Sequence, residues 1–560
     1  MSKEETMSIN DDGKAVSLGH YLHPKGRRGG PLFLPFKSLK KHCAVIAPSG
    51  SGKTESIIIP WTLELLHQGA SVITIDVKGD LITRFGNSVQ NLGCRLWYWN
   101  AGDPACSHKW NWLDEININD DRDVEAAVNS LLRDKPKAGS EQYLFYLRDC
   151  KWLRAFIKIA KELQFLGNPS PRPNDLYNLI VDRGGIIDKI FNRYPFLRDK
   201  YLGELKDLLD YKKTEGKYAL VTQTLRTDLD FFNTSSSVVY VSNSSQFSLK
   251  NIDEHPTLLV IGASLAGGQQ SATLSSLMLN LMFNCAYRRF EGSEPRRRSW
   301  YFMIDESPRL KDRIDFEEVL SMARSADVGI CLAAQDVNQF GNEQEFEKVF
   351  INCETFITLK GCSSKTAEYF SQRLGQRQET RVSRTETEKD LFSMIVDMID
   401  QDWRDDPIKK TTTAQQVPVL GRREIMYPPF QQTYCGVVQV RDASAKPFLV
   451  DLQREIINPV TTHQFLLKIG GKVTPLPLYY GKKLLEQDVP GLKSYLYNNI
   501  VAGVSCSPNK TNDLGLTNLS NQSWIVVYLG GQQISVPVSG FLKLEIGAII
   551  NFVVIQGEIC

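Results

Sequence analysis

The sequence lacks three features that would each narrow its function at once: a strong net charge, a metal-binding cysteine pattern and a long apolar run. Sixty-six basic residues stand against 64 acidic ones, so the net charge is only +2. No global field draws such a chain toward nucleic acid. Any contact with a polyanion must therefore use local groups of basic residues.

Cysteine and histidine are placed in a way that argues against a zinc site. The 11 cysteines include no Cys-x-x-Cys pair, and the seven histidines are spread from His20 to His463. Zinc sites usually group such ligands at short spacings. We expect reduced, mostly buried thiols.

Long apolar segments are missing as well. No run approaches the ~18 to 20 residues that a membrane-spanning helix needs, and the polar start at residues 1–5 has no signal-peptide core. We expect a cytoplasmic protein, with peripheral attachment to the inner membrane as a second option. At 560 residues and 42% hydrophobic content, the chain can form several domains with their own cores.

What the sequence does contain is a nucleotide motif in two halves. The first half, Ala47-Pro-Ser-Gly-Ser-Gly-Lys53-Thr54, follows an apolar strand and precedes a helical pattern. Small residues leave backbone amides free to face phosphate oxygens, Lys53 would reach the β- and γ-phosphates, and Thr54 would ligate Mg²⁺. Ala47 replaces the usual first glycine without blocking the loop. The expected nucleotide contacts are Ala47, Pro48, Ser49, Gly50, Ser51, Gly52, Lys53, Thr54 and Glu55.

The second half is the apolar strand Trp300-Tyr-Phe-Met-Ile-Asp305-Glu306. Asp305 is the candidate Mg²⁺ ligand, in direct or indirect contact, and Glu306 is the candidate base that orients the attacking water. A pair of surface acids is the alternative. The apolar residues before the pair favour a buried strand that ends at the ligand-binding edge of a sheet. The two halves together predict an ATPase.

Other strand ends and two arginines are weaker candidates. Asp76 and Gln335 each follow an apolar strand, and Gln335 could sense the γ-phosphate or be an ordinary polar residue at a strand end. Arg324 and Arg373 lie on expected helices, and either could act as an arginine finger across a subunit boundary. A surface salt bridge is the alternative for each. The sequence does not choose between them.

The order of patterns predicts an α/β nucleotide domain interrupted by helices. We expect a flexible tail over residues 1–15, the nucleotide domain over 16–117 and 251–455, an all-α insert over 118–250, and a β-sandwich-like module over 465–560. The charged segment 376–410 is expected to be an exposed linker. Gly530-Gly531 between two strand patterns predicts a hairpin.

Together these residues resemble the coupling ATPases of conjugative type IV secretion, of the TraG/TraD type, in the FtsK/HerA-like branch of RecA-type motors. The resemblance covers most of residues 16–455. It rests on Ala47–Thr54, Asp76–Asp80, Trp110–Leu113, the helical insert, Ile304–Leu310, and Ala334–Asp336 with Gln339.

The resemblance implies a RecA-like domain, a homo-hexameric ring with ATP and Mg²⁺ bound between subunits, and a pore for DNA. ATP hydrolysis would then deliver DNA, or DNA linked to a relaxase or other cargo protein, to a secretion channel. Such proteins usually begin with membrane-spanning helices, and this chain shows none. It would therefore either reach the channel through a separate membrane anchor or be a soluble relative with another task.

The C-terminal module suggests an alternative function. Leu514–Ser520 and Leu544–Phe552 faintly resemble strands of a forkhead-associated domain, but the arginine and Ser-x-x-His that bind phosphothreonine are missing. A β-sandwich that recruits a partner by shape fits better. In this alternative the chain is a cytosolic ATPase switch or adaptor that selects protein cargo through its β module.

Overall fold

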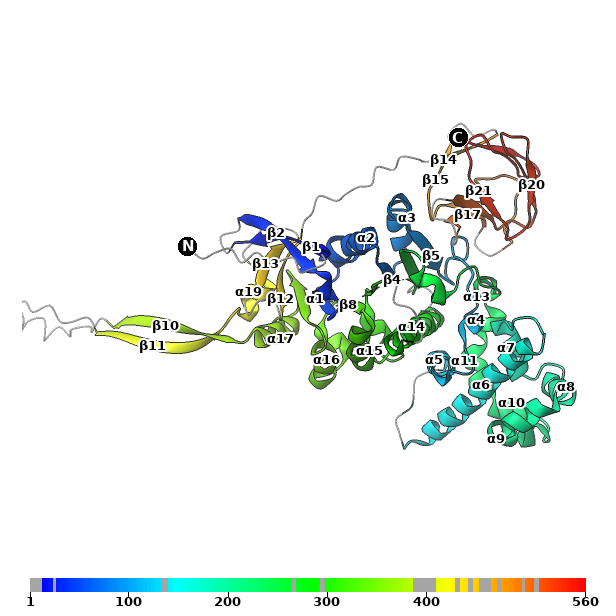
Figure 1. The fold of residues 1–560 in the computed structure, drawn as a ribbon, viewed down its shortest axis with the longest axis horizontal. Coiled ribbons are helices and arrows are strands. Elements are labelled where there is room, and N and C mark those ends of the chain that lie inside the picture. The colour runs from blue at the N-terminus through cyan, green and yellow to red at the C-terminus, as the bar shows by residue number, and fades with distance from the viewer. Residues whose placement is uncertain are drawn as a thin grey trace, which may run out of the picture.

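The structure is a computed structural model that describes residues 13–23, 27–132, 136, 139–263, 268–292, 298–385, 409–428, 434–441, 447–452, 465–470, 475–495, 499–507 and 513–560. The expected flexible tail falls mostly outside these residues. Figure 1 shows a central sheet with its helices, a helical region, a separate β module and a long two-stranded ribbon.

The central sheet has eleven strands within the described residues, in the order β2-β1-β13-β12-β9-β3-β8-β7-β4-β6-β5. From β9 to β5 all neighbours are parallel, and the four strands from β2 to β12 extend one edge antiparallel. The strands are β1 (Ala15–Leu22), β2 (Arg28–Pro35), β3 (Cys43–Ile46), β4 (Ser71–Asp76), β5 (Arg95–Trp99), β6 (Thr257–Gly262), β7 (Trp300–Ile304), β8 (Val328–Ala334), β9 (Thr355–Leu359), β12 (Cys435–Val440) and β13 (Phe448–Asp451).

The parallel strands are apolar because helices cover both faces of this part of the sheet. In β8 and β9, for example, every residue is buried. The flanking helices are α1 (Phe36–Leu39), η1 (Thr54–Ile58), α2 (Ile59–His67), α3 (Leu81–Asn91), α14 (Gly268–Glu291), η4 (Ser307–Leu310), α15 (Phe316–Ala323), η5 (Arg324–Ala326), η6 (Val337–Phe340), α16 (Glu343–Phe350) and α17 (Ser364–Leu374). Helix α17 ends at Gly375, whose φ of 77° suits glycine.

Helices fill the chain between β5 and β6. Side-chain caps begin several of them: Asp120 accepts from Arg122 N, and Ser140 accepts from Tyr143 N. The elements are α4 (Trp112–Glu115), α5 (Asp121–Leu131), α6 (Glu141–Phe165), α7 (Pro173–Ile180), α8 (Ile186–Arg193), α9 (Pro195–Lys212), α10 (Lys217–Val221), α11 (Gln223–Leu229), α12 (Phe231–Thr234), α13 (Ser236–Ser242) and η2 (Leu249–Asp253). Figure 1 shows α6 to α11 gathered at one side of the sheet.

The expectation of a linker over residues 376–410 is wrong at both ends of that segment. Strands β10 (Gln376–Thr385) and β11 (Lys409–Pro418) pair antiparallel into a ribbon that extends away from the rest of the molecule (Figure 1). Apolar alternation, the usual sign of a strand, is absent because neither face is built to cover a core. Helix α19 (Arg422–Met426) returns the chain from the ribbon toward β12.

The C-terminal module is β-rich, as expected, and contains two sheets within the described residues. Their orders are β15-β14-β23-β22-β19-β20 and β16-β17-β18-β21. The strands are β14 (Phe465–Ile469), β15 (Leu476–Leu478), β16 (Lys483–Leu485), β17 (Ile500–Cys506), β18 (Leu514–Asn518), β19 (Trp524–Val527), β20 (Gln533–Val536), β21 (Phe541–Lys543), β22 (Ile549–Asn551) and β23 (Gln556–Ile559). The predicted hairpin at Gly530-Gly531 joins β19 to β20.

The module packs directly on the edge of the central sheet. His108 Nε2 lies 2.8 Å from Cys506 O, and its Nδ1 accepts from Tyr98 N at 2.9 Å. Lys483 forms an ion pair with Asp103 at 2.8 Å. These contacts tie β16 and β17 to the segment that follows β5.

All eleven cysteines are free thiols, and ten are buried. No helix in the part of the chain that the structure describes combines the length and the apolar character needed to cross a bilayer. A mixed α/β fold with a large, mainly parallel sheet and a C-terminal β region confirms the expected fold class.

Candidate nucleotide site

The phosphate loop joins the carboxyl end of β3 to the first turn of η1. Gly50 and Gly52 have φ angles of 75° and 87°, a region that favours glycine. Ala47 is buried at the strand end, its N–H donates to Ala334 O at 3.0 Å, and its φ is not positive, so this position does not require glycine. The sequence therefore forms the expected order of strand, loop and helix.

Lys53 is buried at the centre of this loop. Its ammonium donates to Ala47 O and, at 3.2 Å, to Pro48 O. Burial lowers the pKa of Lys53, and the nearby carboxylates of Asp305 and Glu306 act in the opposite direction. A cation held by neutral carbonyls at a glycine-containing loop is suited to receive an anion.

The two halves of the motif meet in space. Thr54 Oγ1 donates to Asp305 Oδ2 at 2.9 Å, although the two residues are 251 positions apart in the chain. They meet because β3 and β7 are both hydrogen-bonded to β8. Asp305 Oδ1 accepts from Glu306 N at 2.9 Å. Hydroxyl and carboxylate oxygens are ligands that Mg²⁺ prefers.

Glu306 is held in an unusual conformation. Its φ and ψ are 49° and 38°, a left-handed region that costs a non-glycine residue about 1–2 kcal/mol. Gln335 Nε2 donates to both carboxylate oxygens of Glu306, at 3.0 and 3.2 Å. The backbone of Gln335 is fixed in turn, since its N–H donates to Gln339 Oε1 at 2.8 Å. Backbone strain that is held by specific contacts is typical of functional sites.

A cavity of about 180 Å³ lies over the loop. Its lining residues are Pro48, Ser49, Gly50, Ser51, Gly52, Lys53, Thr54, Glu55, Lys78, Asp80, Arg84, Asp305, Glu306 and Tyr434. Gln335 does not line the cavity itself, but it is hydrogen-bonded to Glu306, which does. Asp76 does not line it; its carboxylate caps the following turn by accepting from Gly79 N at 2.7 Å and Leu81 N at 3.0 Å. Burial raises the pKa of Asp76 to about 6.

Four lining residues, Lys78, Asp80, Arg84 and Tyr434, were not among the contacts expected from the sequence. Lys78 and Arg84 follow β4 closely, and Arg84 forms ion pairs with Glu55 and, at 3.1 Å, with Asp80. Because Lys78 and Arg84 closely follow the strand that ends in Asp76, their position in the sequence indicates that they lie near the site. Tyr434 precedes β12, and its ring packs on Gly52 so closely that a Cβ there would lie 2.2 Å from the ring. Nothing in the local sequence indicates this contact.

The two arginine candidates lie outside the cavity. Arg373 donates to Gln439 Oε1 at 3.0 Å and to the carbonyls of Phe350 and Cys353 at 3.2 and 2.7 Å. These bonds hold the last turn of α17 against neighbouring segments and use the Arg373 guanidinium fully. Arg324 is exposed just before the amino end of β8, and its side chain makes no hydrogen bond or ion pair with the residues that the structure describes.

The cavity fits a phosphate group and a divalent cation. Ser51 Oγ is buried at the loop and has no hydrogen-bond partner among the described residues. A buried hydroxyl without a protein partner is expected to hydrogen-bond to a bound ligand, such as a phosphate oxygen. Thr54 and Asp305 supply hard oxygen ligands beside it.

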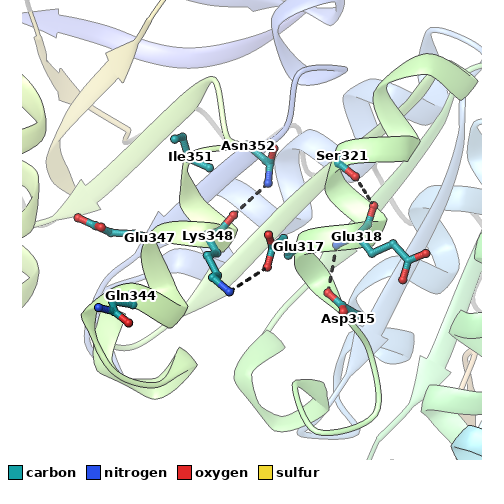
Figure 2. A pocket seen from close by; sticks show the side chains of 9 residues that line it. All are labelled: Asp315, Glu317, Glu318, Ser321, Gln344, Glu347, Lys348, Ile351 and Asn352. Atoms are coloured by element: carbon teal, nitrogen blue, oxygen red, sulfur yellow. Dashed lines mark hydrogen bonds and ion pairs between the residues drawn. The ribbon is translucent and has the colours of Figure 1, made fainter.

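A larger hollow, of about 660 Å³, lies between α15 and α16 (Figure 2). Figure 2 shows Glu317 paired with Lys348, with Asp315, Glu318 and Glu347 around them. Carboxylates outnumber the single lysine in its lining, so a phosphate would be repelled there. The smaller cavity is therefore the candidate nucleotide site.

Solved structures share this fold. The bacterial conjugative coupling protein TrwBdeltaN70, in its unbound monoclinic form, has a TM-score of 0.55 at 15% identity, covering 81% of this chain and 92% of that one. The plasmid coupling protein TrwB with the ATP analogue ADPNP has a TM-score of 0.54 at 17% identity, with the same coverages. The complex of TrwB with ADP and Mg²⁺ has a TM-score of 0.52 at 17% identity, covering 79% and 94%.

No curated protein matches the sequence significantly. A family model described as type IV secretory system conjugative DNA transfer matches residues 2–163 and 199–396. This match includes both halves of the nucleotide motif and well over half of the 560 residues. The chain therefore belongs to the type IV secretory system family of conjugative DNA transfer proteins.

Proposed function

We propose that the protein is an ATPase that couples ATP hydrolysis to the movement of DNA, or of a DNA-linked cargo protein such as a relaxase, toward a type IV secretion channel. The observation that carries the proposal is the meeting of Lys53, the Thr54–Asp305 pair and the Glu306–Gln335 pair around one cavity. The relatives with ADPNP and with ADP and Mg²⁺ support ATP and Mg²⁺ as the ligands.

Each side chain has a distinct task in this proposal. Lys53 and the backbone amides of the loop bind phosphate oxygens, and Ser51 Oγ gains the partner it lacks. Thr54 and Asp305 hold Mg²⁺, which supplies charge neutralisation for the phosphates. Glu306 accepts a proton from the attacking water, and Gln335 orients the Glu306 carboxylate.

The assembly is a homo-hexamer whose pore handles DNA and which reaches the channel through a separate membrane anchor. Arg324 is the better arginine finger, because its guanidinium is exposed whereas that of Arg373 is bonded within its own subunit. Native mass spectrometry with ATP and DNA tests this assembly. A particle that stays monomeric would contradict it.

Substitutions at the cavity test the ATPase proposal. Lys53→Ala should abolish nucleotide binding, and Glu306→Gln should retain binding and lower kcat at least about 100-fold, the usual contribution of a general base. Glu318→Gln, an exposed acid of the hollow in Figure 2, is the matched control and should leave kcat unchanged.

DNA coupling is tested separately on the wild-type protein. Hydrolysis should rise when DNA is added, and the DNA affinity should fall as salt rises. ATP hydrolysis with neither effect would refute the coupling to DNA while leaving the ATPase standing.

A further inference from the structure

The turn after β4 carries a lysine to the rim of the nucleotide cavity. Strand β4 ends at Asp76, and Lys78, two residues later, is one of the residues that line the cavity. The Lys78 side chain is exposed, and it makes no hydrogen bond or ion pair with the residues that the structure describes. The roles given above to the other lining residues leave this ammonium group unused.

The backbone that carries Lys78 is held in place by Asp76. Both carboxylate oxygens of Asp76 accept from the turn, Oδ1 from Gly79 N at 2.7 Å and Oδ2 from Leu81 N at 3.0 Å. Gly79 has a φ of 78°, a left-handed conformation that glycine adopts without strain. A constrained backbone reduces the entropy that is lost when a residue binds a ligand. The turn therefore suits Lys78 to a defined contact.

The strand order places this turn beside the acidic strand end. Strand β4 is hydrogen-bonded to β7, and β7 leads directly to Asp305 and Glu306. In the proposed function, Glu306 accepts a proton from the water that attacks the γ-phosphate. Lys78 thus reaches the cavity from the side of the acidic strand, where the γ-phosphate lies in that proposal, whereas Lys53 reaches it from the phosphate loop.

The charges that line the cavity do not by themselves favour a triphosphate. The described lining residues include three bases and four acids: Lys53, Lys78, Arg84, Glu55, Asp80, Asp305 and Glu306. Arg84 is ion-paired with Glu55 and Asp80, so its charge is offset within the protein. Among the described lining residues, Lys53 and Lys78 are the cations that form no ion pair. Both charges are therefore open to a bound anion.

Lys78 also acts electrostatically on Lys53. Burial is the main cause that lowers the pKa of Lys53, and the positive charge of Lys78 lowers this pKa further. Two like charges at one cavity repel each other. An anion bound in the cavity replaces this repulsion by an attraction to each lysine.

We propose that Lys78 contacts the γ-phosphate of bound ATP and neutralises its charge during hydrolysis. The inference rests on the proposed function and adds a catalytic residue to it, with Asp76 as the residue that positions Lys78. Phosphoryl transfer is accelerated chiefly by positioning and by neutralising charge on the transferred group. Lys78 supplies this charge from the subunit that also supplies the phosphate loop, so its contact with nucleotide does not depend on a neighbouring arginine.

Removal of the Lys78 charge tests the contact. The probes are ADP and ADPNP, which differ by the γ-phosphate, titrated with Mg²⁺ against the wild-type protein and Lys78→Gln. The variant should bind ADPNP at least about tenfold more weakly, as expected for the loss of a hydrogen bond to a charged group. It should bind ADP within about twofold of wild type, and its kcat should fall at least about tenfold. Lys78→Arg, which keeps the charge, should bind ADPNP more tightly than Lys78→Gln does.

The control removes a lysine elsewhere on the surface. Lys348 is exposed, lies outside the cavity and forms an ion pair with Glu317. Lys348→Gln should leave both nucleotide affinities and kcat unchanged, because an exposed ion pair contributes little. A loss of ADPNP affinity equal to that of Lys78→Gln would reveal a general effect of net charge and would overturn the proposal.

Asp76→Asn tests the positioning of Lys78. An amide offers one acceptor oxygen where the carboxylate offers two, so the turn loses at least one of its hydrogen bonds. We expect weaker ADPNP binding with ADP binding little changed, and no further loss when Lys78→Gln is added. Losses that add in the double variant would overturn the positioning role of Asp76.

The outcomes separate the Lys78 contact from the proposed function. Wild-type ADPNP affinity and kcat in Lys78→Gln overturn the contact and leave the ATPase intact. Equal losses of ADP and ADPNP affinity overturn the assignment to the γ-phosphate. A wild-type protein that binds neither nucleotide, or that binds both without hydrolysing ATP, refutes the proposed function itself.

Discussion

At the scale of single residues, the close contact between Gly52 and Tyr434 shows how the phosphate loop is constrained from outside. Gly50 and Gly52 both have positive φ angles, so alanine at either position carries a backbone cost of about 1–2 kcal/mol. Only at Gly52 would the new Cβ meet the Tyr434 ring, whereas open space surrounds Gly50. The two glycines therefore form a matched pair.

We predict that Gly52→Ala weakens binding of a fluorescent ATP analogue more than Gly50→Ala does. The additional loss comes from the clash with the ring, so adding Tyr434→Ala should return Gly52→Ala to the level of Gly50→Ala. Titration of the analogue against each variant measures the effect. Equal losses in the two single variants, with no recovery in the double variant, would show that Tyr434 does not constrain the loop.

At the scale of elements, the segment after β5 is held to the β module by a buried neutral histidine. Burial lowers the pKa of His108 from 6.5 to about 4, and its two ring nitrogens are used by Tyr98 N and Cys506 O. Between pH 6.5 and 4 the unfolded chain binds a proton that the folded chain does not. Folded-state stability therefore falls as the pH drops through this window.

We predict that His108→Gln flattens the dependence of Tm on pH between about 7 and 5. In the wild-type protein, His108 lowers the free energy of unfolding by up to about 3 kcal/mol as the pH falls, and this loss is complete near pH 4. His42, buried with the same pKa of about 4, retains its own share. Asp76, with its pKa raised to about 6, acts in the opposite direction because its folded form binds the proton. An unaltered slope in the variant would contradict the prediction.

Sequence patterns predicted the elements of the sheet well but missed the ribbon. Apolar runs such as Val328–Ala334 give strands because parallel strands are buried on both faces. The ribbon has no such pattern, since its strands are held by hydrogen bonds to each other and cover no core. Hydrophobic periodicity detects elements that bury one face, so it does not detect an exposed element that has no buried face.

At the scale of the whole molecule, the β module is fixed to the central α/β domain by a close approach of two backbones. A Cβ on Gly503 would lie 2.0 Å from Ala105 O, a backbone atom that cannot move cheaply. The module is thereby placed against the edge strand β5 and the segment after it. The module and the central α/β domain therefore share a packed interface.

We predict that Gly503→Ala releases the module while the remaining domains stay folded. Small-angle X-ray scattering should show a larger radius of gyration, and ATP hydrolysis should persist because the cavity lies elsewhere. Gly530→Ala, at an open turn of the same module, is the control and should leave the scattering unchanged. An unchanged radius in Gly503→Ala would show that the interface tolerates the added carbon.

The sequence by itself determined the phosphate loop, the acidic strand and the alternation of strands and helices, because each depends on a local pattern of small, charged or apolar residues. Only the tertiary structure decided which distant residues meet. It brought Thr54 to Asp305 and Gln335 to Glu306, placed Tyr434 on Gly52, and hydrogen-bonded Arg373 to the carbonyl of Cys353. These pairings follow from the order of strands in the sheet, which no local pattern encodes.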